Sequence, residues 1–197
     1  DIGALAVARR MSEALGAPLV YQPYSRLVID CNRAPGVDSS IPVESDGTRV
    51  PGNLDLTPAQ IEARVEDVFR PYHETMGRLL DERAHRRRPT VLVSVHSFTP
   101  TLRTDPSPRP WAIGVIYGRD ARIARHLIRL LREALACEVG DNRPYVVDLE
   151  NDYTIPVHGE RRGLPCVELE LSQDLVADAE GQRRWADLLV EWLPRAV

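Results

Sequence analysis

Apolar positions along the chain follow two spacings, which alternate from one segment to the next. A spacing of about 3.6 residues predicts helices that bury one side, and short continuous apolar runs predict buried strands. Helices are predicted over residues 2–15, from Pro58 to the basic run at 83–88, and over residues 121–136 and 182–193. Extended runs are predicted over residues 18–22, 27–31, 90–96, 111–117 and 164–171. This alternation indicates an α/β fold with a largely parallel sheet.

Local signals mark the ends of several predicted elements. Gly16 stands where the C-cap of the first helix is expected. Thr57, with Gln60 three residues later, forms a capping-box pattern at the start of the long helix. Pro71 lies inside that helix and should kink or split it. Residues 34–55 are rich in Pro, Gly, Ser and Asp and predict a long irregular loop, a type of segment that often carries function.

The size and composition are those of one globular domain. The chain has 197 residues, 43% apolar and 27% charged, which is enough for a single domain over residues 1–197 with a substantial core. No apolar run reaches the roughly 18 residues of a membrane span. A net charge of −4 gives no general attraction to nucleic acid or to an anionic membrane. Cys31, Cys137 and Cys166 are widely spaced without CxxC pairing, so a reduced, cytoplasmic protein is expected.

His96 is the first candidate for chemistry. It ends a strongly apolar predicted strand and is followed by the loop Ser-Phe-Thr-Pro. Ligands of open α/β sheets bind at the carboxyl ends of strands, and a neutral imidazole fixed there suits a divalent metal. A buried histidine satisfied by backbone groups is the alternative explanation.

Two carboxylates form the second candidate. Glu168 and Glu170 lie two residues apart in the predicted strand at 164–171, so their side chains share one face. A strand buried on both faces should not carry two carboxylates without a reason, and a general base beside a metal is one such reason. An edge strand with one solvated face is the alternative.

An Asn-Arg pair follows the extended run at 27–31. The guanidinium of Arg33 can bind a carboxylate through two hydrogen bonds, and Asn32 adds a neutral donor beside it. Such a pair would recognise an acidic substrate, and Arg26 could supply a second cation. Each arginine could equally be an ordinary surface residue.

Three further residues are weaker candidates. Tyr153 and His158 precede the strand that carries the two glutamates, where a lid or an oxyanion donor could lie. His73 falls within a helical pattern and is interpreted as structural. His85 and His126 lie among arginines on predicted helices and are interpreted as solvated.

Several ordered sequence blocks resemble the N-formylglutamate amidohydrolase family, which is itself similar to the zinc carboxypeptidases. The resemblance covers essentially the whole chain. The blocks are DIGALAVARRM (1–11), SRLVIDCNR (25–33), PYH (71–73), SVHSFTP (94–100), RPWAIGVIY (109–117) and GLPCVELELSQDL (163–175). The resemblance implies a three-layer αβα fold with a mainly parallel mixed sheet of the zinc carboxypeptidase (phosphorylase/hydrolase-like) kind.

The resemblance also implies roles for single residues. His96 looks like the zinc-binding histidine at the end of a central strand. Asn32 and Arg33 look like the pair that holds a substrate carboxylate, and Glu170 looks like the glutamate general base. Glu170 fits better than Glu168 because the family places this glutamate four residues before an Asp-Leu pair, here at 174–175.

Two departures from the family pattern stand out. Ser172 occupies a position, two residues after the glutamate, where the family usually has an arginine. The family also has an N-terminal strand ending in a histidine-containing motif, which would precede Asp1 and supply a further zinc ligand. Asp1 aligns with a family aspartate that could also reach the metal.

The sequence therefore predicts a zinc-dependent amidohydrolase. Its expected substrate is a small N-acyl derivative of an acidic amino acid such as N-formyl-L-glutamate, cleaved to formate and glutamate, as in histidine degradation. Nucleic acid and membranes are not expected partners. A carboxylate-binding protein of the same fold that has lost catalysis is the alternative, and a structural α/β domain without metal is a third.

Overall fold

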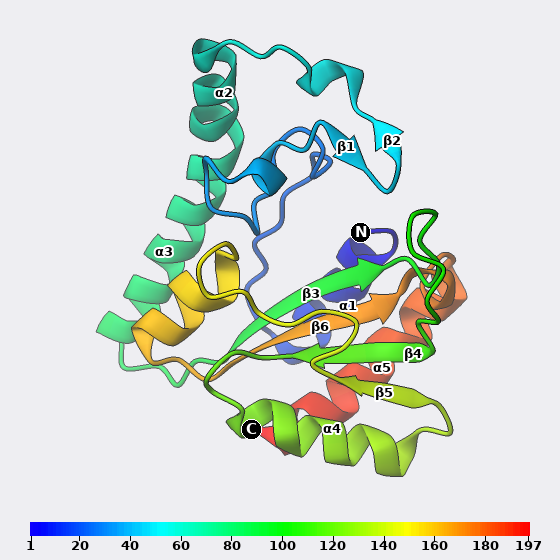
Figure 1. Ribbon diagram of the computed structural model, residues 1–197. Helices are drawn as coiled ribbons and strands as arrows, with labels where there is room; N and C mark the ends of the chain where they lie inside the picture. The colour runs from blue at the N-terminus through cyan, green and yellow to red at the C-terminus, as the bar shows by residue number, and fades with distance from the viewer.

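A four-stranded mixed sheet forms the centre of the protein, which the computed structural model describes over residues 1–197 (Figure 1). The strand order is β3-β6-β4-β5. The strands are β3 (Leu92–Phe98), β4 (Trp111–Ile116), β5 (Glu138–Asp141) and β6 (Cys166–Ser172). Two of the three neighbouring pairs, β3–β6 and β4–β5, are parallel, while β4 and β6 are antiparallel. The predicted α/β class with a mainly parallel sheet is confirmed.

Three helices bury one face of this sheet. They are α1 (Ala4–Leu15), α4 (Arg122–Ala134) and α5 (Ala179–Ala196). Their apolar sides join the inward residues of the strands in the main core, whose largest fully buried members include Ile113, Leu127, Leu131, Leu169 and Leu189. The apolar stripe that predicted each helix is therefore the stripe that packs on the sheet.

The opposite face of the sheet is covered only in part. A π-helical turn, η4 (Thr154–Gly159), packs against β3 and β6, and helix α3 (Arg70–His85) packs behind it. The result is a three-layer arrangement in which η4 and α3 form the layer opposite α1, α4 and α5 (Figure 1).

The long predicted helix is split, as expected from its proline. It begins at α2 (Pro58–Arg64), where Thr57 and Gln60 form the predicted capping box. It then passes through a π-helical stretch (Val65–Phe69) and continues as α3. The ring of Pro71 cannot donate a backbone hydrogen bond, and the wider turns directly before it accommodate that loss. The short strands β1 (Glu44–Ser45) and β2 (Thr48–Arg49) lie in the predicted loop region.

Two predicted extended runs are wrong, because residues 18–22 and 27–31 form no strand. Ile29 is buried instead against Val68 and Phe69, in a small cluster separate from the main core. Side chains rather than a neighbouring strand satisfy the backbone there, because Asn53 and Arg64 donate to the carbonyl oxygens of residues 27 and 28. Conversely, β5 was not predicted. None of the helices combines the length and the apolarity that crossing a lipid bilayer requires.

Candidate active site

The candidate residues of β3 and β6 face the same side of the sheet. His96 pairs with Glu170, and Ser94 pairs with Glu168, across the parallel strands. Side chains of directly paired residues point to the same face, and here that face is the one away from the main core. The sheet therefore gathers an imidazole and two carboxylates on one surface.

His96 lies between two groups of polar side chains. Its Nδ1 is 3.0 Å from Oδ2 of Asp1, and its Nε2 is 2.9 Å from the hydroxyl of Ser94. Oε2 of Glu168 lies 3.8 Å from the same Nε2. The alternative explanation, a histidine satisfied by backbone groups, is therefore wrong. The ring is held in a defined orientation with 23% of its side chain exposed.

The start of α1 brings Asp1 to this position. Gly3 has a φ of 77°, and a Cβ there would lie 2.0 Å from the carbonyl oxygen of Val176, just beyond β6. Only glycine fits so close an approach with a left-handed backbone. Ser97 also donates its hydroxyl to the carbonyl oxygen of Ile2, 2.7 Å away. Both contacts fix Asp1 beside His96.

Both glutamates are buried, and β6 is a central strand that is buried at every residue. The alternative of an edge strand with a solvated face is therefore wrong. Glu168 accepts a hydrogen bond from Nδ2 of Asn32 at 3.3 Å. Glu170 differs, because its Oε2 is buried without a hydrogen-bond partner.

Burial raises the pKa of the Glu170 carboxyl from 4.5 to about 7. Charge interactions with His96 and Arg109 oppose this rise in the pKa of Glu170, and the Glu168 carboxylate adds to it. A carboxyl group with a pKa near neutrality can take up and release a proton at working pH. Among the two glutamates, Glu170 therefore has the environment of a general base.

Asn32 and Arg33 are held in place by the segment before η4. The backbone N–H of Thr154 donates to Oδ1 of Asn32 at 3.0 Å, and Arg33 forms an ion pair with Asp152. An isolated antiparallel bridge also joins Arg33 to Asp152. Asn32 thus reaches Glu168, and a clamp between two loops, not the predicted strand end, positions it.

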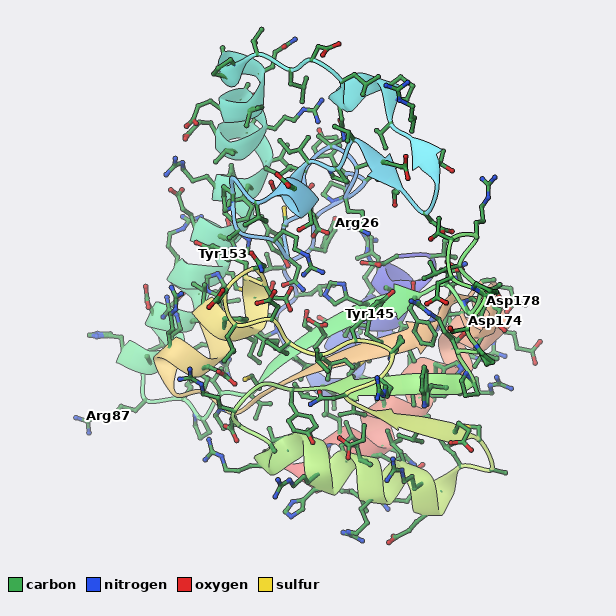
Figure 2. The ribbon with its side chains drawn as sticks, viewed as in Figure 1. Arg26, Arg87, Tyr145, Tyr153, Asp174 and Asp178 are labelled. Atoms are coloured by element: carbon green, nitrogen blue, oxygen red, sulfur yellow. The ribbon has the colours of Figure 1, made fainter.

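Arg26 lies apart from the surface that carries His96 and the two glutamates. Its side chain is half exposed, and its Nε donates to Oδ2 of Asp30 at 2.9 Å. No contact joins it to His96 or to the two glutamates. Figure 2 shows Arg26 in the segment above the sheet and Tyr145 over the sheet itself.

The three weaker candidates form a buried cluster behind the clamp. His73 Nε2 is 2.8 Å from the carbonyl oxygen of Cys31, and its Nδ1 is 2.9 Å from Nε2 of His158. A carbonyl only accepts, so His73 donates from Nε2 and receives the proton of His158 at Nδ1. Tyr153 packs against the His73 ring, with 4.3 Å between ring centroids. The cluster supports residue 31, next to Asn32, which fits the structural interpretation of His73 and leaves His158 and Tyr153 without contacts to the glutamates.

Arg109 and Tyr145 also belong to this surface and were not predicted. Arg109 lies two residues before β4, and its guanidinium donates to the hydroxyl of Tyr145 at 3.1 Å while lying over the Tyr145 ring. Arg109 lies near enough to Glu170 to lower the pKa of its carboxyl group. Only the antiparallel direction of β4 brings the start of this strand to the end of β6, and no sequence signal reveals that direction.

The donors around His96 fit a divalent metal in part. An imidazole nitrogen and a carboxylate oxygen are ligands that zinc takes, and the Ser94 and Glu168 contacts on the other ring nitrogen resemble the outer contacts that orient a metal-binding histidine. No group of three or more His, Cys, Asp and Glu side chains is arranged to hold a metal ion. The structure therefore brings together one imidazole and one carboxylate, His96 and Asp1, at this point.

Comparisons with known proteins bear on the family and the fold. The family model described as N-formylglutamate amidohydrolase matches residues 1–177. The crystal structure of gene product Atu2144 from Agrobacterium tumefaciens is similar, with a TM-score of 0.93 and 37% sequence identity. The similarity covers 100% of this chain and 77% of that chain. No curated protein sequence matches the chain.

Proposed function

The chain belongs to the N-formylglutamate amidohydrolase family, a family of hydrolases that act on an amide bond, and from this premise we propose that it removes the N-formyl or another N-acyl group from an acidic amino acid. With N-formyl-L-glutamate and water, the products are formate and L-glutamate. The buried, unpartnered carboxyl group of Glu170 opposite His96 is the observation that carries the proposal.

Glu170 acts as the general base. Its carboxylate takes a proton from the water that attacks the acyl carbon, and the resulting acid returns the proton to the leaving amine nitrogen. The pKa of about 7 suits both transfers, because the group gains and loses a proton with little free-energy cost near neutral pH. Glu168 is tied to Asn32 and keeps that amide oriented.

His96 and Asp1 would hold the zinc ion in this proposal. Zinc in such a site supplies a Lewis acid that polarises a carbonyl group and makes water a better nucleophile at neutral pH. Ser94 and Glu168, on the far side of the imidazole, keep the ring turned so that Nδ1 faces Asp1.

Asn32 and Arg33 bind a carboxylate of the substrate. Their positions are fixed before the substrate arrives, because the clamp to residues 152–154 holds both side chains. Such preorganisation lowers the entropy lost on binding. We include Arg26 as a second cation, more distant, in the same proposal. A cytoplasmic location and a role in histidine degradation complete it, and three free cysteines fit a reducing compartment.

Metal content and formate release test this function together. The purified full chain is analysed for zinc and assayed with N-formyl-L-glutamate before and after chelation. The assay is repeated with Glu170→Gln and with Glu180→Gln, a control at an exposed position of α5. About one zinc per chain, with turnover lost on chelation and in Glu170→Gln but not in the control, is the expected result.

Two other outcomes separate the parts of the proposal. Zinc without turnover of N-formyl-L-glutamate, but with hydrolysis of another N-acyl amino acid, rejects the formyl substrate and keeps the amidohydrolase. A folded chain that binds no metal and hydrolyses no N-acyl amino acid rejects the proposed reaction. It would favour the alternative, a protein that binds carboxylate ligands without catalysis.

A further inference from the structure

The arginines near the site differ in what they already bind. Arg33 is paired with Asp152, and Arg26 is paired with Asp30. Arg109 has no carboxylate partner within ion-pair distance, and its N–H groups reach only the carbonyl oxygen of Thr99, at 3.4 Å, and the hydroxyl of Tyr145. Of these three, it is the guanidinium whose charge no protein carboxylate neutralises.

The topology places Arg109 at the proposed reaction centre. β4 runs antiparallel to β6, with Ile113 opposite Leu171 and Gly114 opposite Glu170. The start of β4 therefore meets the carboxyl end of β6, where Ser172 provides a hydroxyl that donates to Asp174 and no positive charge. Arg109 supplies, from the neighbouring strand, a cation at the end of β6.

The segment that carries Tyr145 is fixed over the same face. Gly114 and Gly140 lie side by side in β4 and β5, and the carbonyl oxygen of Arg143 packs where a Cβ of either residue would lie. Two residues later, Tyr145 reaches Arg109, with 5.3 Å from its ring centroid to the guanidinium carbon. The phenol ring of Tyr145 limits the positions of the long Arg109 side chain, which would otherwise move freely.

We infer that Arg109, oriented by Tyr145, binds one of two carboxylates of a dianionic N-acyl amino acid, while Asn32 and Arg33 bind the other. A guanidinium offers several N–H donors to one carboxylate, and its contacts to Thr99 and Tyr145 leave donors free. The inference rests on the proposed function, which it narrows to substrates with two negative charges. The carboxylate concerned belongs either to the side chain or to the α-carbon of the substrate.

Three compounds and four variants test this subsite. N-formyl-L-glutamate carries both carboxylates, N-formyl-L-glutamine lacks the side-chain charge, and N-formyl-L-isoglutamine lacks the α-carboxylate charge. The variants are Arg109→Gln, Arg109→Lys, Tyr145→Phe and the control Arg103→Gln. Arg103 lies in the same connection between β3 and β4 and donates to Thr48. KM and kcat are measured for each pair, and Kd is measured by calorimetry.

Arg109→Gln should raise KM and Kd for N-formyl-L-glutamate about 10- to 100-fold, the usual effect of losing hydrogen bonds to a charged group. The change in kcat should be smaller than the change in KM. Tyr145→Phe should have a smaller effect, Arg109→Lys should restore part of the affinity, and Arg103→Gln should resemble the wild type. Arg109→Gln should have no effect on the compound that lacks the carboxylate bound by Arg109. This result identifies which of the two carboxylates Arg109 binds.

Equal effects of Arg109→Gln on all three compounds, or no effect on any, would overturn the subsite. Failure of the proposed function is a separate result, since the wild type would then hydrolyse none of the compounds. The calorimetric comparison still decides in that case. If Arg109→Gln weakens binding only of the compounds that carry the bound carboxylate, the subsite is supported although the protein does not catalyse the reaction. If the variant weakens binding of all three compounds equally, or of none, the subsite is rejected.

Discussion

Gly114 of β4 lies directly opposite Glu170 of β6, and the carbonyl oxygen of Arg143 occupies the space beside it. A Cβ on Gly114 would lie 2.0 Å from that oxygen, far closer than atoms can approach. The missing side chain therefore allows the segment before Tyr145 to lie flat on the sheet. Gly114 therefore lies beside Glu170, the proposed general base, and at the same time supports the segment that carries Tyr145, which holds Arg109.

Gly114→Ala should therefore impair both folding and substrate binding. The methyl group must push residues 143–145 away from the sheet, and overpacking of this kind costs about 1–3 kcal/mol in the free energy of unfolding. Urea denaturation and KM for N-formyl-L-glutamate measure the two effects. Gly52→Ala is the control, because a Cβ at Gly52 meets nothing within 4 Å. Equal behaviour of the two variants would contradict the role of Gly114.

Glu170→Gln should separate stability from catalysis. The amide keeps the shape of the side chain but cannot act as a base, and general base catalysis contributes about 10²- to 10⁴-fold to a rate. The variant should lose that factor in kcat yet unfold at the same or a higher urea concentration, because no ion pair or hydrogen bond holds the native carboxylate. A stable variant with unchanged kcat would remove Glu170 from the mechanism.

The His73–His158 pair should make the protein sensitive to acid. Burial lowers the pKa of both rings from 6.5 to about 4. Because the folded-state pKa values are depressed, the unfolded chain binds more protons between these limits. Stability is therefore full above about pH 6.5 and falls as the pH decreases towards about 4, by about 1.4 kcal/mol per pH unit for each histidine.

Urea denaturation over this pH range measures the effect. His158→Gln keeps an N–H donor for His73 but cannot be protonated, so the loss of stability on acidification should become clearly smaller. His126→Gln is the control at an exposed position of α4. If His158→Gln and the wild type lose stability equally between about pH 6.5 and 4, other groups carry the acid sensitivity.

Arg33 and Arg26 should contribute unequally to substrate binding. Arg33→Gln should raise KM for N-formyl-L-glutamate about 10- to 100-fold, because its guanidinium lies in the clamp beside Asn32. Arg26→Gln should change KM by less than about threefold, since its half-exposed side chain contacts neither His96 nor the two glutamates and an exposed ion pair contributes little. Steady-state kinetics on both variants test this order, and a larger effect at Arg26 would reverse it.

The sequence predicted the elements whose apolar patterns match their burial. Strands β3, β4 and β6 and helices α1, α4 and α5 all lie within a few residues of their predicted positions. The run at 27–31 failed because its apolar residues pack on a helix rather than in the sheet. β5 was not predicted because its four residues, one of them a glycine, are too few to show a clear pattern of apolar positions.

A site residue could be predicted where its own type and its position in a predicted element indicate its role. His96 and Glu170 pair across the sheet, and Asn32 reaches Glu168 beside them. Arg109 could not be found in this way, because its position depends on the direction of β4. The ion pair of Arg33 was also invisible in the sequence, since its partner Asp152 lies 119 residues away in the chain.

The central position of β6 also determines when the site can form during protein synthesis. β3 and β4 precede β6 in the chain, yet each of them pairs with β6 and not with the other. A nascent chain emerging from the ribosome therefore holds these two strands without their common neighbour until Ser172 has been made. Glu168 and Glu170 arrive with that strand, so the candidate site cannot assemble before β6 has been made.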